Sequence, residues 1–268
     1  MPVARHFSEL APSTRHSGCA TRAPHKTAGA RLGAAGAKIL TVAAMVAGAC
    51  KESSPPPSTP AAANAPAPAS ASIAPGAPPS PALMDATRST ERAPDVFRVR
   101  FETTRGPFVV EIRREWAPFG VDRFHYLVRN GFYDGTRFFR VLDGFMAQFG
   151  ISGDPRTTAS WRDRRIPDDI GKQSNTRGTM SFASAGPGSR TSQLFINFRD
   201  NKTLDQNFAP IGKIVEGMAV VDSLYKAYGE GAPSGNGPEQ ERIMTEGETY
   251  LAKEFPKLDR VIRAALVN

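Results

Sequence analysis

The run FFRVLDGFMAQFG, residues 138–150, says more about this chain than any other part of its sequence. Its aromatic and aliphatic residues flank the dipeptide Asp143-Gly144, so it predicts a strand, a turn and a second strand. Arg140 and Gln148 lie within these strands, and such side chains are costly to bury without partners. The pattern fits an apolar groove that the two residues border. It fits equally well two half-buried strands whose polar residues face water.

A second run, GTMSFASAGPGSRTSQLFIN at residues 178–197, predicts a strand of small residues, a Gly-Pro-Gly loop and another apolar strand. Three runs, FFRVLDGFMAQFG, SFASAGPGSRTSQLFIN and LDQNFAPIGKIVEGM (residues 204–218), resemble those of the cyclophilins, the peptidyl-prolyl cis–trans isomerases. They occur in the family's order and at about its spacing. The resemblance therefore covers the core of a domain from about Val96 to the C-terminus.

Many short strands and few helices are predicted along this domain. Alternating apolar and polar residues predict a hairpin over 96–102 and 108–113, and a helix begins near Pro118 and ends at Asn130-Gly131. This pattern favours a closed β-barrel, and the resemblance implies the eight-stranded antiparallel cyclophilin barrel capped by α-helices. Further strands are expected at 137–142, 145–149, 178–183, 193–198, 209–215 and 259–267, with helices at 218–225 and 239–253 and a flexible loop at 229–238.

Residues 51–95 are mostly Pro, Ala and Ser and contain almost no large apolar side chains. Such a segment cannot bury enough surface to offset the entropy of ordering it, so we predict a disordered tether. Residues 96–268 remain, and this length suits one domain with a full core.

Residues 1–50 form a basic leader with an apolar end. The run ILTVAAMVAGAC, residues 39–50, has about the length of a signal-peptide core and is too short for a comfortable membrane span. Its end resembles a bacterial lipobox, in which the cysteine is lipidated, although Ala47 stands where leucine is usual. We expect an exported protein of the periplasm or cell envelope. It is anchored to the membrane through Cys50 or, in the alternative, cleaved after Ala49 without a lipid.

The net charge of +8 does not indicate a nucleic-acid-binding protein, because the leader holds +5 of it. The run RDRR at 162–165, beside Trp161, is one basic and aromatic patch in a nearly balanced domain. Cys19 and Cys50 are the only cysteines and both precede the domain, while His125 is its only histidine. These counts exclude a disulfide, a thiolate nucleophile and any metal site that needs two histidines from the domain. We expect no cofactor.

Catalysis of X-Pro isomerisation needs little of this chemistry. The peptide bond resists rotation with a barrier of about 18–20 kcal/mol, and a catalyst must stabilise the twisted amide, whose nitrogen becomes basic. It needs a donor to that nitrogen, a pocket for the ring and anchors for the backbone. The resemblance implies that Arg140 is the catalytic donor and that Gln148 works beside it. The substrate-binding positions that it implies are Phe145, Met146, Phe195 and Leu204 around the ring, Ala183 and Ser184 for the preceding residue, and Gln193 behind them. Phe208 is predicted as a further substrate-binding position.

Three positions depart from the family's usual residues. The common tryptophan is Thr203, the usual histidine is Phe208 and the usual asparagine is Ser184. The tryptophan and histidine positions vary in the family without abolishing turnover, and the arginine is present. We therefore expect activity to survive and cyclosporin binding to weaken.

The sequence thus predicts a monomeric isomerase that acts on proline-containing polypeptides during folding. It is expected to form no covalent intermediate and to bind no nucleic acid. The alternative is a non-catalytic module that binds proline-containing peptides, and the intact set Arg140, Phe145 and Gln148 argues against it.

Overall fold

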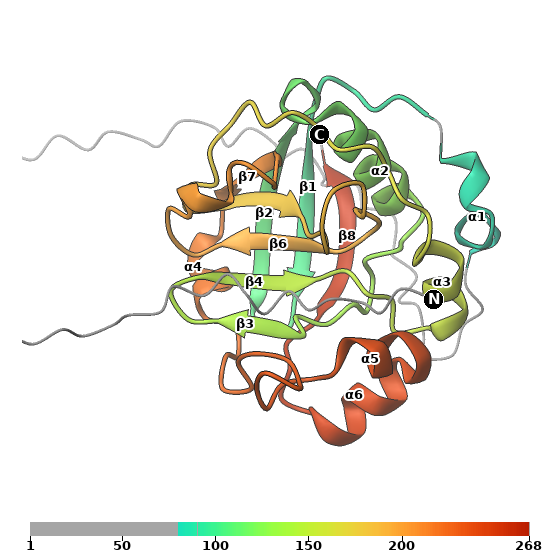
Figure 1. The fold of residues 1–268 in the computed structure, drawn as a ribbon, viewed down its shortest axis with the longest axis vertical. Coiled ribbons are helices and arrows are strands. Elements are labelled where there is room, and N and C mark those ends of the chain that lie inside the picture. The colour runs from blue at the N-terminus through green and yellow to red at the C-terminus, as the bar shows by residue number, and fades with distance from the viewer. Residues whose placement is uncertain (1–79, 90, 268) are drawn as a thin grey trace, which may run out of the picture. The chain divides into compact units, whose positions relative to one another are not determined.

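The computed structural model describes residues 80–89 and 91–267 (Figure 1). The predictions for the leader, including Cys50, and for most of the tether lie outside these residues. Eight strands form one antiparallel sheet in the order β3-β4-β6-β5-β7-β2-β1-β8. Their bounds are β1 Val96–Thr103, β2 Gly106–Arg113, β3 Arg140–Leu142, β4 Met146–Phe149, β5 Thr179–Phe182, β6 Leu194–Asn197, β7 Pro210–Glu216 and β8 Val261–Val267.

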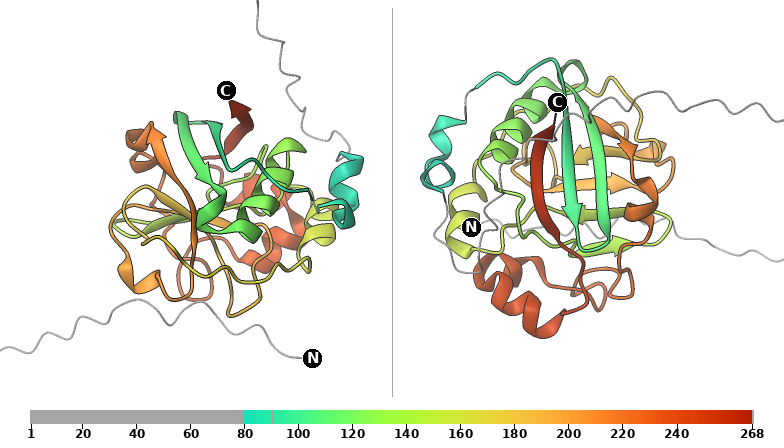
Figure 2. Two further views of the ribbon diagram at one scale, coloured as in Figure 1. Left: turned by 90° about the horizontal axis from the view of Figure 1, so that it is seen from above. Right: turned by 180° about the vertical axis from the view of Figure 1, so that it is seen from behind.

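In the view of Figure 1, α1, α2 and α3 lie to the right of the sheet, α5 and α6 lie below it, and α4 lies at its left edge; Figure 2 gives two further views. Helix α2 packs against β8, and α5 packs against both α3 and α6. Short 3-10 turns at Ala86–Arg88, Arg114–Trp116 and Lys202–Leu204 complete the regular structure of the described residues. The α-helices are α1 Pro81–Met84, α2 Pro118–Arg129, α3 Pro155–Trp161, α4 Met218–Asp222, α5 Gln240–Glu246 and α6 Glu248–Glu254.

The sheet is curled but open, so the predicted closure into a barrel is wrong, although the eight antiparallel strands are confirmed. Strands β3 and β8 end the sheet, and within residues 80–267 the seam between them carries one isolated bridge, Arg137↔Arg260, with backbone hydrogen bonds from 135–138 to 259–261. Farther along β8, the edge that does not pair with β1 has a side chain beside it instead of a strand. The Asp134 carboxylate accepts a hydrogen bond from the Ala264 N–H at 2.8 Å, and α2 covers this side.

The predicted hairpin is present and carries the centre of the core. Phe101 faces Phe108 in the register of β1 and β2, and their rings stack with centroids 4.9 Å apart. Both side chains are buried because alternate residues of a strand point to the same face. Two smaller apolar clusters lie beside this core. One joins Phe139 and Ile151 to α5 and α6, and the other surrounds Met146 and Phe195.

The predicted helix over 239–253 is two helices. Gly247, with φ at 61°, ends α5 and begins α6. This backbone conformation favours glycine, and a Cβ atom at this position would overlap the carbonyl oxygen of Gly153. Helix α3 was not predicted, because its two turns contain Thr157 and Thr158, which carry little helical signal.

The described residues before β1 pack on the domain, which differs from a tether running to residue 95. Leu83 and Ala86 are buried in the main core. The indole N–H of Trp161 donates to the Leu83 carbonyl at 2.7 Å, and the Tyr126 hydroxyl contacts the Ala82 carbonyl at 3.0 Å. The sequence did not indicate this packing, because the few apolar side chains lie in a stretch dominated by Pro, Ala and Ser.

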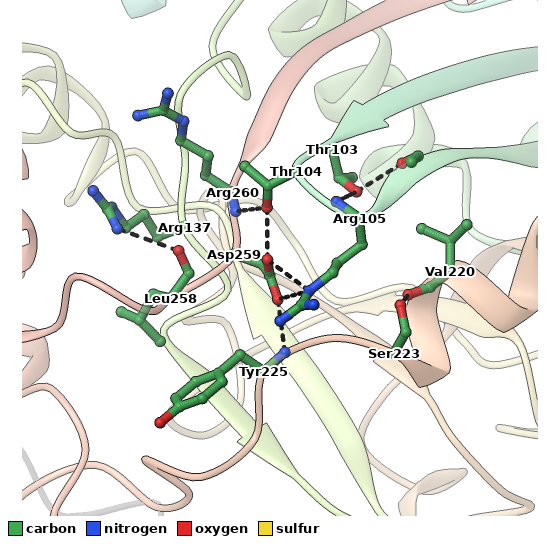
Figure 3. A network of polar contacts seen from close by, with 11 residues as sticks. Thr103, Thr104, Arg105, Arg137, Val220, Ser223, Tyr225, Leu258, Asp259 and Arg260 are labelled. Carbon is green, nitrogen blue, oxygen red and sulfur yellow. Dashed lines mark hydrogen bonds and ion pairs between the residues drawn. The ribbon is translucent and has the colours of Figure 1, made fainter.

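A buried carboxylate joins three separate parts of the chain (Figure 3). Asp259, two residues before β8, accepts hydrogen bonds from the Thr104 hydroxyl at 2.7 Å and the Arg105 guanidinium at 2.9 Å. It also accepts one from the Tyr225 backbone N–H at 2.7 Å. The β1–β2 turn, the segment after α4 and the segment before β8 are thereby held together. The segment after Tyr225 leads to the loop at 229–238.

Candidate functional site

The site is built around Arg140 and Gln148, which face each other across the β3–β4 pair. The Nη1 of Arg140 donates to the Gln148 side-chain oxygen at 3.2 Å. Gln148 in turn donates its amide to the side-chain oxygen of Gln193 at 2.9 Å. Arg140 and Gln148 are only 6% and 5% exposed. Of the two interpretations open from the sequence, the structure therefore supports the groove.

An apolar pocket adjoins this polar row. Met146, Phe195, Leu204 and Phe208 are buried in one cluster with Ala183, and half-buried Phe145 packs against it. The rings of Phe195 and Phe208 meet edge to face with centroids 5.4 Å apart. Arg140 and Gln148 also line this pocket, so a guanidinium stands at the edge of an apolar cup.

Two asparagines that sequence reasoning missed hold the far wall of the pocket. The Asn201 amide donates to the Phe145 carbonyl at 2.9 Å and to the Asn197 side chain at 2.8 Å. The Asn175 amide donates to the Phe208 carbonyl at 2.8 Å. The segment that carries Leu204 and Phe208 is thereby fixed to the sheet. The sequence gives little indication of the role of Asn175 and Asn201, because asparagine is common in loops.

A wider groove of about 410 Å³ continues from the pocket. Arg140, Gln148, Ala183, Ser184 and Gln193 line it. The Ala183 N–H donates to the Gln193 carbonyl at 2.9 Å, so the segment after β5 runs beside the end of β6. The structure thus brings together all ten residues predicted for catalysis or substrate binding.

Sequence reasoning missed the acidic group of this site. Glu230, in the loop predicted to be flexible, binds Arg140 through two hydrogen bonds, Nε to Oε1 and Nη2 to Oε2, each of 2.6 Å. Burial favours the neutral acid, but the hydrogen bonds and positive charge of Arg140 outweigh this, and the pKa of Glu230 lies below its usual value. Glu230 is therefore ionised at neutral pH.

The basic and aromatic patch at residues 161–165 does not expose its aromatic ring. Trp161 is fully buried, and its ring packs under the guanidinium of Arg123 at 5.0 Å. An indole in this position cannot stack on a base. Within residues 80–267, no group of three or more His, Cys, Asp or Glu side chains is arranged to hold a metal ion. In the same part of the chain, no helix has the length and apolar character that a membrane span requires.

The sheet and the site together define an isomerase-like protein: a peptide groove with an apolar cup, an arginine at its edge and an amide row beside it. The comparisons with known proteins make this class specific. Residues 98–247 match the family model described as cyclophilin type peptidyl-prolyl cis-trans isomerase/CLD. The chain belongs to this family, and its activity is peptidyl-prolyl cis–trans isomerisation.

Curated relatives agree. The chain is 36% identical over 135 residues to a peptidyl-prolyl cis-trans isomerase of Acinetobacter baylyi, covering 47% of this chain and 70% of that one. It is 38% identical over 133 residues to peptidyl-prolyl cis-trans isomerase A of Dickeya dadantii, with the same two shares. The chain is also similar to a solved cyclophilin type isomerase of Cryptosporidium parvum, with 20% sequence identity and a TM-score of 0.48. That match covers 65% of this chain and 98% of the solved chain.

Proposed function

We propose that Arg140 is the group that lowers the barrier to X-Pro rotation. The observation that carries this proposal is a buried guanidinium at the rim of an apolar cup. Phe145, Met146, Phe195 and Leu204 line the same pocket as Arg140, so a prolyl ring bound among them would have its nitrogen beside that rim. As the amide twists, the lone pair of its nitrogen is no longer delocalised into the carbonyl, and a donor to this lone pair stabilises the transition state more than the planar ground state.

The amide row supports the same step. Gln148 and Gln193 form a continuous hydrogen-bonded line from Arg140 along the groove. We assign Gln148 to the substrate backbone beside the proline, and Ala183 and Ser184 to the residue that precedes it, because these residues line the groove next to the cup. The step makes and breaks only hydrogen bonds, so it requires neither a covalent intermediate nor a cofactor.

The substrates of this activity are proposed to be proline-containing polypeptides during folding. X-Pro bonds exchange over tens to hundreds of seconds without a catalyst, which is slow enough to limit folding. A monomer is proposed as the active unit. The alternative of a non-catalytic module predicts peptide binding without acceleration. A protease-coupled assay on a short Ala-Pro peptide distinguishes the two, since wild-type protein at micromolar concentration should shorten the slow phase.

The location of the protein is proposed from the sequence alone. The basic leader, the short apolar run and the sequence VAGAC at residues 46–50 support a bacterial protein that is exported to the periplasm or cell envelope. Lipidation at Cys50 would hold it at a membrane. The Pro- and Ala-rich residues between Cys50 and the domain would then give the domain reach toward its clients.

A further inference from the structure

The loop that follows α4 contributes a charged group that the proposed catalytic step does not use. We propose that Glu230 is a positioning residue, which fixes the orientation of the Arg140 guanidinium for catalysis. This inference rests on the proposed role of Arg140. Ninety residues separate the two in the chain, and their side chains are 33% and 7% exposed. The pair is therefore part of the groove wall and is not an exposed surface salt bridge.

The contacts on the guanidinium come from two directions. Glu230 binds its Nε and Nη2 edge with two hydrogen bonds of 2.6 Å. Gln148 accepts from Nη1 at 3.2 Å on the other side. A planar group held by a bidentate carboxylate and by a third contact has little freedom to rotate. Its orientation in the groove is therefore set before a substrate arrives.

The backbone around Glu230 is shaped to hold its carboxylate. The Gly231 N–H donates to the same Oε1 atom at 2.9 Å, and the Gly237 N–H donates to the Glu230 carbonyl at 2.7 Å. The loop passes so close to this carbonyl that a Cβ atom at Gly237 would lie 2.7 Å from it. At Gly235 a Cβ atom would overlap the same oxygen. Glycine is needed at both positions for the loop to close around Glu230.

The loop is also fastened to the part of the sheet that carries Arg140. Tyr228 packs edge to face on Phe255 with ring centroids 5.0 Å apart. Phe255 belongs to the apolar cluster that contains Phe139, the neighbour of Arg140 in the chain. At the other end of the loop, the Glu239 N–H donates to the Tyr250 hydroxyl at 3.1 Å. Helix α6 and Phe255, which follows it, therefore pack against both the loop of Glu230 and the strand residue beside Arg140.

A carboxylate beside a catalytic cation has two opposite effects. It reduces the positive potential that the prolyl nitrogen meets, and it removes the need to reorient the guanidinium during the reaction. Preorganisation is the larger effect in many sites, since a misplacement of about 1 Å can cost about 100-fold in rate. We therefore expect the loss of the carboxylate to slow isomerisation and not to accelerate it.

The test compares four variants in the full chain: Glu230→Gln, Arg140→Ala, the double variant and Glu246→Gln. Glu246 is a matched control, because it binds Arg242 through the same Nε–Oε1 and Nη2–Oε2 pattern, at 2.6 and 3.1 Å, on the exposed face of α5. Isomerisation rates are measured by NMR exchange on an Ala-Pro peptide at several peptide concentrations, which separates kcat from KM. The thermal midpoint of each variant reports on its fold.

We expect Glu230→Gln to lower kcat by about tenfold while KM stays within about twofold, because orientation matters mainly in the transition state. Glu246→Gln should match the wild type. In the double variant, the Glu230 substitution should add nothing to the loss caused by Arg140→Ala, since Glu230 acts through that side chain. The NMR signal of the Arg140 Nε–H should broaden in Glu230→Gln alone.

Different results overturn different statements. Wild-type or faster kcat in folded Glu230→Gln contradicts the positioning role, even if Arg140→Ala is inactive. Additive losses in the double variant show that Glu230 acts on the substrate independently of Arg140, which also contradicts it. Wild-type turnover in Arg140→Ala overturns the proposed function itself. If Glu230→Gln does not fold, Gly237→Ala displaces the carboxylate by its backbone instead, and an unchanged kcat in that variant rejects the inference.

Discussion

Arg140 and Gln148 occupy directly opposed positions of the β3–β4 pair, and their side chains are joined by a hydrogen bond of 3.2 Å. The turn between the strands fixes this register, with Gly144 at a φ of 64°. Successive residues of a strand point to opposite faces, so a slip by one residue would separate the pair from the groove. The hydrogen-bonded pair Arg140 and Gln148, and the catalytic role proposed for it, therefore depend on a short turn as well as on the two side chains.

Arg140→Ala should lower kcat/KM for an X-Pro peptide by at least about tenfold, because a single preorganised donor supplies a few kcal/mol of transition-state stabilisation. The protease-coupled assay measures this loss, and circular dichroism checks that the domain stays folded. Arg242→Ala serves as the control, since Arg242 forms ion pairs with the carboxylates of Glu246 and Glu254 but lies outside the site. Equal turnover in wild type and Arg140→Ala would remove the arginine from its assigned role.

Thr203→Trp should tighten inhibition by cyclosporin by about tenfold, because an indole adds a large apolar surface and an N–H donor. Thr203 is exposed in the 3-10 turn Lys202–Leu204, directly before the pocket residue Leu204. Inhibition constants of the wild type and the variant are compared, with Lys202→Trp as a control on the same turn. Strong inhibition of the wild type, with no gain in Thr203→Trp, is the result that this prediction forbids.

The pocket could be predicted from the sequence because it consists of three local runs. Arg140, Phe145 and Gln148 lie in one hairpin, and their spacing survives any error in the rest of the fold. Ser181–Asn197 adds a second hairpin, and the third run adds Leu204 and Phe208. The family resemblance then supplied the roles that spacing could not.

Glu230 could not be predicted in the same way. It reaches Arg140 across ninety residues of chain, from a stretch whose glycines, prolines and serines indicate only a loop. Glycine in such a stretch is compatible with two structures: a flexible segment, or a tight loop in which another backbone group packs against the glycine. Gly235 and Gly237 belong to a tight loop, because the Glu230 carbonyl packs against both of them, and the sequence does not indicate this contact. The prediction of a closed barrel was wrong for a similar reason. Asp134, whose carboxylate binds the Ala264 N–H of β8, lies far from that strand in the sequence.

Asp259→Asn should lower the free energy of unfolding by about 2–3 kcal/mol, because it weakens several hydrogen bonds to a buried carboxylate and removes its charge beside Arg105. Urea denaturation measures the change. Asp95→Asn is the control, since Asp95 makes an exposed pair with Arg92 and should cost less than about 1 kcal/mol. A loss at Asp259 as small as at Asp95 would show that the network in Figure 3 contributes little.

Cys50→Ser should move the protein from the membrane fraction to a soluble or unprocessed pool without changing its isomerase activity. A lipoprotein carries enough acyl chains for stable anchoring, and the substitution removes their attachment point. Labelled fatty acid and cell fractionation provide the measurements, with Cys19→Ser as the control. A wild-type protein that fractionates as soluble, or never takes up the label, points instead to a plain secreted or periplasmic form.

His125→Phe should reduce the dependence of stability on pH between about 7.5 and 5.5. His125 is buried on α2, its ring meets Phe97 edge to face at 5.0 Å, and its Nδ1 has no hydrogen-bond partner. Burial, helped by the charge of Arg129, lowers the pKa of His125 below its usual value of 6.5.

The direction of the effect follows from proton binding. In the unfolded chain a histidine takes up a proton as the pH falls through about 6.5, whereas the folded protein takes it up only at lower pH. The unfolded state therefore binds more protons in this window, and the wild type loses stability as the pH falls. Phenylalanine keeps an aromatic ring at this position, cannot be protonated and leaves no unpaired ring nitrogen. Urea midpoints at the two pH values, compared between full-length wild type and variant, cancel the contribution of the three leader histidines. An equal change in both proteins would show that His125 does not cause the loss.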